Sequence, residues 1–258
     1  MLVWLVRGLR KRRITTRYPD TPESPPSGFI GQLELLDPVN APPELAAVCP
    51  TGAIEIGHGR VRVDRGRCIL CGECVRAAPE RFAFAERYES ASRSRAGLVI
   101  GDPSAVSALP DRPVLGEQAR ALRRSIHVRH IDCGSDGSEE WEIQALWNPY
   151  YDIQRLGFFL TAAPRHADIL LVTGGVTEPM RAPLERTWDV MPTPKALIAV
   201  GTDACSGGLA TACGLVAGGV DQVLPVDVYI PGSPPAPIAI LDGLLQAVGL
   251  VTEPGAVA

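Results

Sequence analysis

The sequence is organised around Cys68-Ile69-Leu70-Cys71-Gly72-Glu73-Cys74, together with Cys49-Pro50 further upstream. Three cysteines at C-x2-C-x2-C spacing can surround one iron–sulfur cube from a single tight loop. A fourth ligand from a distant Cys-Pro completes the arrangement that bacterial ferredoxins use. The spacing therefore predicts one 4Fe–4S cluster, with Cys49, Cys68, Cys71 and Cys74 as its ligands.

Two other uses of these cysteines are weaker. C-x2-C pairs also bind zinc, but zinc sites usually combine two separated pairs rather than a triple run. A disulfide is disfavoured because the loop is too tight. In addition, seven cysteines without a secretory signal peptide indicate a reducing compartment, so we expect a cytoplasmic protein.

Residues from about 28 to about 88 resemble a ferredoxin domain built for two clusters, of the type found in complex I and formate hydrogenlyase. The segment 49–54 matches the end of the first cysteine run, and the segment 64–79 matches the second run. At family spacing, the ligands of the other cluster fall on Val39, Pro42, Leu45 and Ala78. Because one ligand set is lost completely while the other is kept, the resemblance implies one intact cluster site and one deleted site.

The sequence from about residue 126 to about residue 251 resembles the small electron-transfer subunit shared by complex I and the energy-converting nickel–iron hydrogenases. The matching segments are Pro164-Arg165-His166-Ala167-Asp168, Leu171-Val172-Thr173-Gly174, Pro194-Lys195-Ala196 and residues 225–232. In that family, four cysteines on strand-end loops hold a cluster. Their positions fall here on Asp136, Glu139, Asp203 and Ser233, so the resemblance implies a site that has lost its ligands.

Three interpretations of this degenerate site remain open. The site can be empty, or it can hold a hard cation such as Mg²⁺ or Ca²⁺ on its oxygen atoms. The third interpretation is a cluster rearranged onto Cys133 and Cys205, with or without Cys213, together with a carboxylate. We favour the empty site, because iron–sulfur clusters require thiolates. We expect the four side chains still to converge, and their acids to be neutralised by Arg165, another cation or water.

Strand and helix patterns alternate after residue 125. Strands are expected at 126–131, 168–173, 196–200 and 223–230, and helices at 139–147, 152–160 and 235–248. Buried strands that alternate with helices and end in glycine predict an α/β doubly wound, flavodoxin-like parallel sheet, with function at the carboxyl ends of the strands. We expect this sheet to follow an α+β, ferredoxin-like N-terminal domain with strands at 32–36 and 54–63.

The expected domain organisation has four parts. An amphipathic basic helix and extended arm (1–27) precede the ferredoxin-like 4Fe–4S domain (28–90), a linker with a helix at 116–124 (91–124), and the small-subunit-like domain (125–258). In residues 1–13, apolar residues come before the basic ones, which is the reverse of a secretory signal. This helix can lie in a membrane interface or dock on a partner subunit.

Length and composition restrict the remaining possibilities. A chain of 258 residues can hold two modest domains, and 46% hydrophobic residues indicate a globular protein. A net charge of −4 argues against nucleic-acid binding. Because the chain lacks a run of about 18 apolar residues, we expect no membrane span.

The two resemblances together imply an iron–sulfur subunit of a membrane-associated oxidoreductase complex, without a complete active site of its own. The expected partners are a large hydrogenase-type subunit, or its complex I counterpart, and membrane-arm subunits on the inner face of the cell membrane. An alternative is a mainly structural subunit that couples the large subunit to the membrane arm. A free soluble ferredoxin is disfavoured by the long second domain.

Overall fold

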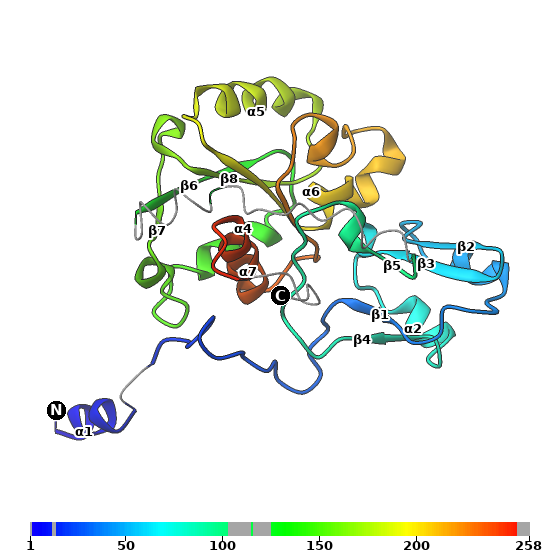
Figure 1. The fold of residues 1–258 in the computed structure, drawn as a ribbon, viewed down its shortest axis with the longest axis horizontal. Coiled ribbons are helices and arrows are strands. Elements are labelled where there is room, and N and C mark those ends of the chain that lie inside the picture. The colour runs from blue at the N-terminus through cyan, green and yellow to red at the C-terminus, as the bar shows by residue number, and fades with distance from the viewer. Residues whose placement is uncertain (1, 12–13, 103–114, 116–124, 252–258) are drawn as a thin grey trace.

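The computed structural model describes residues 2–11, 14–102, 115 and 125–251. We call residues 14–102 the first half and residues 125–251 the second half. Figure 1 shows the first half packed beside one end of the sheet of the second half. The helix expected at 116–124 lies outside the described residues.

The second half is built on a parallel sheet. Within the described residues, five strands form it in the order β10-β9-β8-β6-β7. Their bounds are Ile126–Asp132 (β6), Phe158–Leu160 (β7), Ile169–Thr173 (β8), Ala196–Val200 (β9) and Val228–Ile230 (β10). Read from β7, the strands follow the chain order 2-1-3-4-5, which is that of flavodoxin-like sheets. The doubly wound α/β expectation is confirmed.

Helices cover both faces of this sheet (Figure 1). Helices α4 (Ser138–Ala145) and α7 (Pro237–Ala247) lie on one face, and α5 (Glu178–Val190) lies on the other, together with the short α6 (Thr202–Ser206). Strands β8 and β9 are therefore buried along their whole length. Their continuous apolar sequences reflect this burial, because a parallel strand faces helices on both sides.

Alternate residues of β8 serve the two cores. Ile169 and Leu171 belong to the core under α4 and α7. Leu170 and Val172 belong to the core under α5 and α6. This alternation follows from the two-residue period of a strand.

The helix expected at 152–160 is wrong. The structure has a short 3₁₀ helix, η5 (Ile153–Leu156), followed by the edge strand β7. Asp152 and Gly157 flank η5 with left-handed backbone angles, φ 43° and 90°, which end a right-handed helix on both sides. The aromatic pair Phe158-Phe159 then favours a strand.

Helix α5 was missed in the sequence. Pro183 lies inside it and lacks the N–H that an interior helical residue donates, so the segment resembled a loop. A start signal was nevertheless present: Thr177 at the N-cap, Glu178 in the first turn and a proline beside it.

The first half is a small α/β region. Strand β1 (Leu33–Leu35) pairs with β4 (Phe82–Phe84), and β3 (Arg60–Asp64) lies between β2 (Ile54–Gly57) and β5 (Val99–Ile100), all antiparallel. The short helices are η1 (Pro43–Val48), η2 (Arg65–Arg67), α2 (Glu73–Ala77) and η3 (Ala96–Leu98). Their shared core includes Leu33, Val61, Val63 and Phe82.

Residues 91–102, the described part of the expected linker, pack against the rest of the first half and against the second half. Strand β5 extends the sheet of the first half. Leu98 is buried in the core of the second half, and Ser92 forms a β-bridge with Tyr229. Residues 91–102 therefore contribute packing contacts between the two halves.

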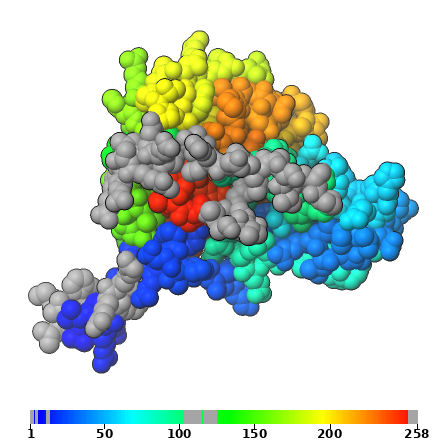
Figure 2. Space-filling view, in the orientation of Figure 1, coloured from blue at the N-terminus to red at the C-terminus, as the bar shows by residue number. Residues whose placement is uncertain are grey.

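The N-terminal helix α1 (Leu2–Lys11) stands apart from the body of the molecule (Figures 1 and 2). Val3, Val6 and Leu9 are exposed on it. The arm that follows is fastened, because the buried Tyr18 hydroxyl donates a hydrogen bond to Asp242 at 2.9 Å. No helix in the described ranges combines the length and apolar content needed to cross a bilayer.

Candidate iron–sulfur site and the strand-end loops

The four predicted cysteines line one pocket. Cys49 follows η1, Cys68 follows η2, Cys71 lies in the next loop and Cys74 lies in α2. The other lining residues are mainly apolar and include Leu33, Ala53, Ile54, Ile69 and Phe84. The pocket thus gathers, from separate elements, the thiols that the spacing predicted.

The backbone of the Cys68–Cys74 loop turns sharply at two points. Leu70 and Gly72 have left-handed angles, φ 57° and 78°. Glycine adopts this conformation readily, but Leu70 does so at a steric cost. The resulting turn leaves Cys68 and Cys74 buried and Cys71 exposed, so the pocket has an inner and an outer side.

The surroundings of the sulfur atoms fit a 4Fe–4S cluster. The N–H of Ala53 donates to Cys49 Sγ at 3.2 Å. Backbone N–H groups also donate to Cys68 and Cys74, and such bonds favour thiolates. Burial raises the pKa of Cys68 to about 12, so its thiol is neutral unless a metal binds it.

The spread of the thiols bears on what they can hold. Among the described residues, no three His, Cys, Asp or Glu side chains lie close enough to share one metal ion. A 4Fe–4S cube distributes its thiolates over several irons. Four thiols around a common apolar pocket suit such a cube better than a single zinc ion.

Three of the four positions that the resemblance assigns to lost cluster ligands, Asp136, Glu139 and Asp203, lie near one another in the structure. Glu139 is 3% exposed at the start of α4. Burial raises the pKa of Glu139 to about 7, and the charges of Asp203 and Asp136 add to this effect. Burial, with the charge of Asp136, also raises the pKa of Asp203. Ser233 is exposed in the loop after β10, and the carboxylates of Asp136 and Glu139 accept from Ser138 instead.

Ser138 is a member of this group that sequence reasoning missed. Its hydroxyl donates to Asp136 at 2.6 Å and to Glu139 at 3.2 Å, and its N–H donates to Asp136 at 2.9 Å. These bonds lower the pKa of Asp136. The position of Ser138 one residue before Glu139 was the available signal, since Ser often bonds nearby groups at a helix start.

The expected neutralising role of Arg165 is wrong. Arg165 lies in η6 (Pro164–His166), which precedes β8 and therefore lies at the amino end of the parallel strands. Glu139 and Asp203 lie at the carboxyl end. A buried carboxyl group with a pKa near neutrality can instead take up a proton.

The remaining cysteines occupy different environments. Cys133 and Cys205 are buried in the core beneath α5 and α6. Burial raises the pKa of Cys133 to about 12 and that of Cys205 further. Cys213 is exposed at the end of η7 (Gly208–Cys213). This arrangement gives no support to a cluster rearranged onto these three thiols.

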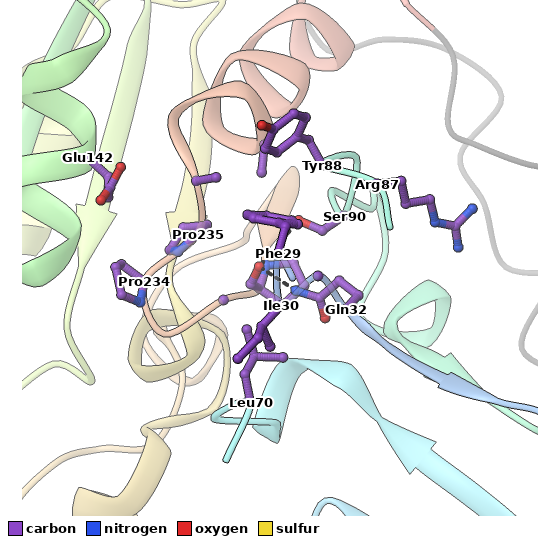
Figure 3. A pocket seen from close by; sticks show the side chains of 15 residues that line it. Phe29, Ile30, Gln32, Leu70, Arg87, Tyr88, Ser90, Glu142, Pro234 and Pro235 are labelled. Atoms are coloured by element: carbon purple, nitrogen blue, oxygen red, sulfur yellow. Dashed lines mark hydrogen bonds between the residues drawn. The ribbon is translucent and has the colours of Figure 1, made fainter. Parts of the chain in front are cut away.

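The cysteine loop packs directly against the carboxyl edge of the sheet. Thr202, the first residue of α6, donates from its hydroxyl to the carbonyl of Cys68 at 2.9 Å. Beside this contact lies a pocket of about 180 Å³ between the halves, lined by residues that include Phe29, Leu70 and Pro235 (Figure 3). The candidate cluster site therefore adjoins the strand-end loops.

These observations define a class of protein, an electron-transfer type of iron–sulfur protein built on a flavodoxin-like sheet. Residues 61–104 match the family described as a 4Fe–4S single cluster domain, a range that includes Cys68, Cys71 and Cys74 but not Cys49. Residues 136–247 match the family described as the NADH ubiquinone oxidoreductase 20 kDa subunit. The chain belongs to this 20 kDa subunit family.

Several relatives show how far the similarity extends. The chain is 45% identical over 134 residues to formate hydrogenlyase subunit 7 of Escherichia coli, covering 52% of each protein. It is 38% identical to the probable membrane-bound hydrogenase subunit mbhJ of Pyrococcus furiosus, covering 52% of this chain and 80% of that protein. It is 41% identical to an NADH-quinone oxidoreductase subunit of Desulfovibrio desulfuricans, covering 43% of this chain and 61% of that protein. The chain therefore spans about half the length of the formate hydrogenlyase subunit.

Proposed function

We propose that the chain is the iron–sulfur subunit of a membrane-associated oxidoreductase complex of the complex I or hydrogenase type. In this proposal Cys49, Cys68, Cys71 and Cys74 hold one 4Fe–4S cluster, which relays electrons. The observation that carries the proposal is the shared pocket of these four thiols. The match of residues 61–104 to a 4Fe–4S domain supports it.

The residues of the pocket have distinct roles in this function. The cluster supplies one-electron chemistry when bound, and the four thiolates fix its position. Leu33, Ile54 and Phe84 exclude water from the inner side. The exposed Cys71 marks the outer side, which is the shortest route for an electron from a protein that docks there.

The domain organisation follows the same division. We place a ferredoxin-like domain at 28–90 and the small-subunit-like domain at 125–258, joined by residues 91–124 and preceded by a helix and arm at 1–27. The core shared by Val61, Phe82 and Cys74 supports the first domain, and the parallel sheet supports the second.

The expected partners are a large hydrogenase-type or complex I-type subunit and membrane-arm subunits. Relatives named as subunits of formate hydrogenlyase and of a probable membrane-bound hydrogenase support a place in such a complex. Trp141, which is 72% exposed near the start of α4, gives an aromatic anchor for the large subunit. Helix α1, with exposed Val3, Val6 and Leu9, would hold the chain on the inner face of the membrane.

A structural role is the second candidate function. Carboxylates, rather than thiolates, occupy the replaced positions at Asp136, Glu139 and Asp203. The second half would then dock the large subunit without passing electrons through its own cluster. In that case the cluster of the first half mainly stabilises the cysteine loop.

Iron analysis tests the electron-relay proposal. Anaerobic reconstitution of the full chain should give about four irons per chain, as one 4Fe–4S cluster requires. Cys71→Ser should abolish this iron and the EPR signal of the reduced cluster. The matched control is Cys213→Ser, an exposed cysteine outside the pocket, which should retain both. About eight irons per chain, or full iron in Cys71→Ser, would contradict the proposal.

A further inference from the structure

A residue of the second half holds the backbone of the candidate cluster loop. The Thr202 hydroxyl donates to the carbonyl of Cys68 at 2.9 Å, although 134 positions separate the two residues. Thr202 is 1% exposed and Cys68 is 9% exposed. A buried carbonyl needs a donor, so the loss of this hydroxyl would leave the Cys68 carbonyl without that hydrogen bond.

The main-chain groups of Thr202 are hydrogen-bonded within the second half, and these bonds fix the position from which its hydroxyl projects. The N–H of Thr202 donates to the carbonyl of Gly232 at 2.7 Å. The carbonyl of Thr202 accepts a hydrogen bond from the Ser206 hydroxyl at 3.0 Å. Both main-chain groups of Thr202 are thus fixed by the second half, while its side chain reaches the first.

The neighbouring strand-end loop is bonded to the first half as well. The carbonyl of Pro231, after β10, accepts from Gln32 Nε2 at 2.9 Å and from the Ser90 hydroxyl at 3.3 Å. Figure 3 shows Gln32 and Ser90 beside the loop that carries Pro234 and Pro235. Two strand-end segments of the second half, the start of α6 with Asp203 and the loop with Ser233, therefore contact the first half.

We propose that Thr202 is a positioning residue for the 4Fe–4S cluster of the first half. Its hydroxyl fixes the Cys68 carbonyl and thereby the direction in which Cys68 presents its sulfur. The strand-end loop that has lost its own cluster ligand, at Asp203, thus positions the cluster of the other half instead. This inference rests on the proposed cluster and adds a function for the degenerate second half.

The test compares two substitutions at this position in the full chain. Thr202→Val keeps the shape of the side chain but removes the donor, and Thr202→Ser keeps the donor. After anaerobic reconstitution, the rate of iron loss to a chelator and the EPR spectrum of the reduced cluster are measured for each. Thr202→Val should lose iron about tenfold faster, since a buried carbonyl without a partner is costly, and its EPR spectrum should change. Thr202→Ser should restore both properties.

Thr211→Val is the matched control. The Thr211 hydroxyl also donates to a main-chain carbonyl, that of Ser206 at 3.0 Å, but this bond lies within the second half. The control should leave iron loss and the EPR spectrum unchanged. Near-UV circular dichroism of Thr202→Val reports whether the second half keeps its packing.

The outcomes separate this inference from the proposed function. Three outcomes would overturn the positioning role. The first is an unchanged cluster in Thr202→Val, and the second is an equal effect of Thr211→Val. The third is a loss of the near-UV signal of Thr202→Val together with its cluster. A wild-type chain that binds no cluster would instead overturn the proposed function. Hydrogen exchange of the iron-free protein adds a readout that needs no cluster: Thr202→Val should speed exchange in residues 68–74.

Discussion

Single residues at the carboxyl edge show how a buried acid is accommodated there. Glu139 packs against the backbone at Gly201, where a Cβ atom would come within 2.4 Å of its carboxylate. Gly201 has a φ of 92°, so the strand-end turn favours glycine and leaves room for the acid. A carboxyl group is thus accommodated by shape, while its charge is opposed by burial and by Asp203 and Asp136.

This balance predicts that the difference in stability between Glu139→Gln and the wild type depends on pH. The pKa of Glu139 is raised from about 4.5 to about 7, so the folded state holds a proton that the unfolded state releases. The stability of the wild type therefore falls as the pH rises from about 4.5 to 7. The neutral variant should be about 2 kcal/mol more stable than the wild type at pH 8, and about equally stable at pH 4, below the unfolded-state pKa. One pKa unit is worth about 1.4 kcal/mol, and partial solvent screening reduces the effect of the full shift.

Urea unfolding at both pH values measures this difference in the free energy of unfolding. Glu178→Gln is the control, since Glu178 is exposed on α5 and should show little effect at either pH. If Glu139→Gln is less stable than the wild type at pH 8, the carboxylate is ionised and has a favourable partner.

At the scale of elements, hydrogen bonds and strand pairing join the segments that lead into the cysteine loop. Asp64 caps η2 by accepting from the N–H of Gly66 at 2.9 Å, and Arg95 holds both Asp64 oxygens at 2.7 and 2.6 Å. Arg95 precedes β5, which joins β3. Arg95, in the last part of the first half, thus fixes the entry to the cysteine loop just before Cys68.

Helix α1 carries the prediction that belongs to this scale. Changing Val3, Val6 and Leu9 to Ser should reduce the fraction of the native complex recovered with the membrane, because these apolar residues are exposed on a basic helix. Iron content should not change. Changing Arg7 and Arg10 to Gln should make recovery less sensitive to salt.

One result would contradict this role for α1, and a second would change the part given to the partners. Unchanged recovery of the triple Ser variant would mean that the helix does not anchor the complex. Equal binding of the isolated chain and the intact complex to anionic vesicles would show that partner docking contributes little.

The sequence predicted the second-half elements unevenly, and the reasons are local. β8 and β9 were found because their uninterrupted apolar residues end in glycine. β7 was missed because Asp152 and Gly157 adopt left-handed angles that no periodicity reports. The cysteine pocket was predictable from spacing, whereas the Thr202–Cys68 bond depends on how the two halves pack, and no local pattern encodes that.

At the scale of the whole molecule, the two halves meet at the functional edge of the sheet. Parallel strands bring their carboxyl ends together whatever residues follow them. Here the cysteine loop occupies that edge through Cys68 and Thr202. The acids at 136, 139 and 203 lie at the same edge, where burial raises the pKa of Glu139 to about 7.

The last prediction concerns the three cysteines that lie outside the proposed cluster site. A triple variant should retain about four irons per chain and the EPR signal of the wild type. It changes Cys133, Cys205 and Cys213 to Ala. Cys133 and Cys205 are buried among apolar side chains, which disfavour the thiolates that iron needs, and Cys213 is exposed on a separate segment. Cys74→Ala is the matched control and should lose the cluster, since Cys74 lines the pocket. Loss of iron in the triple variant, with the second half still folded by near-UV circular dichroism, would show that these thiols hold a cluster and that electrons can pass through the second half.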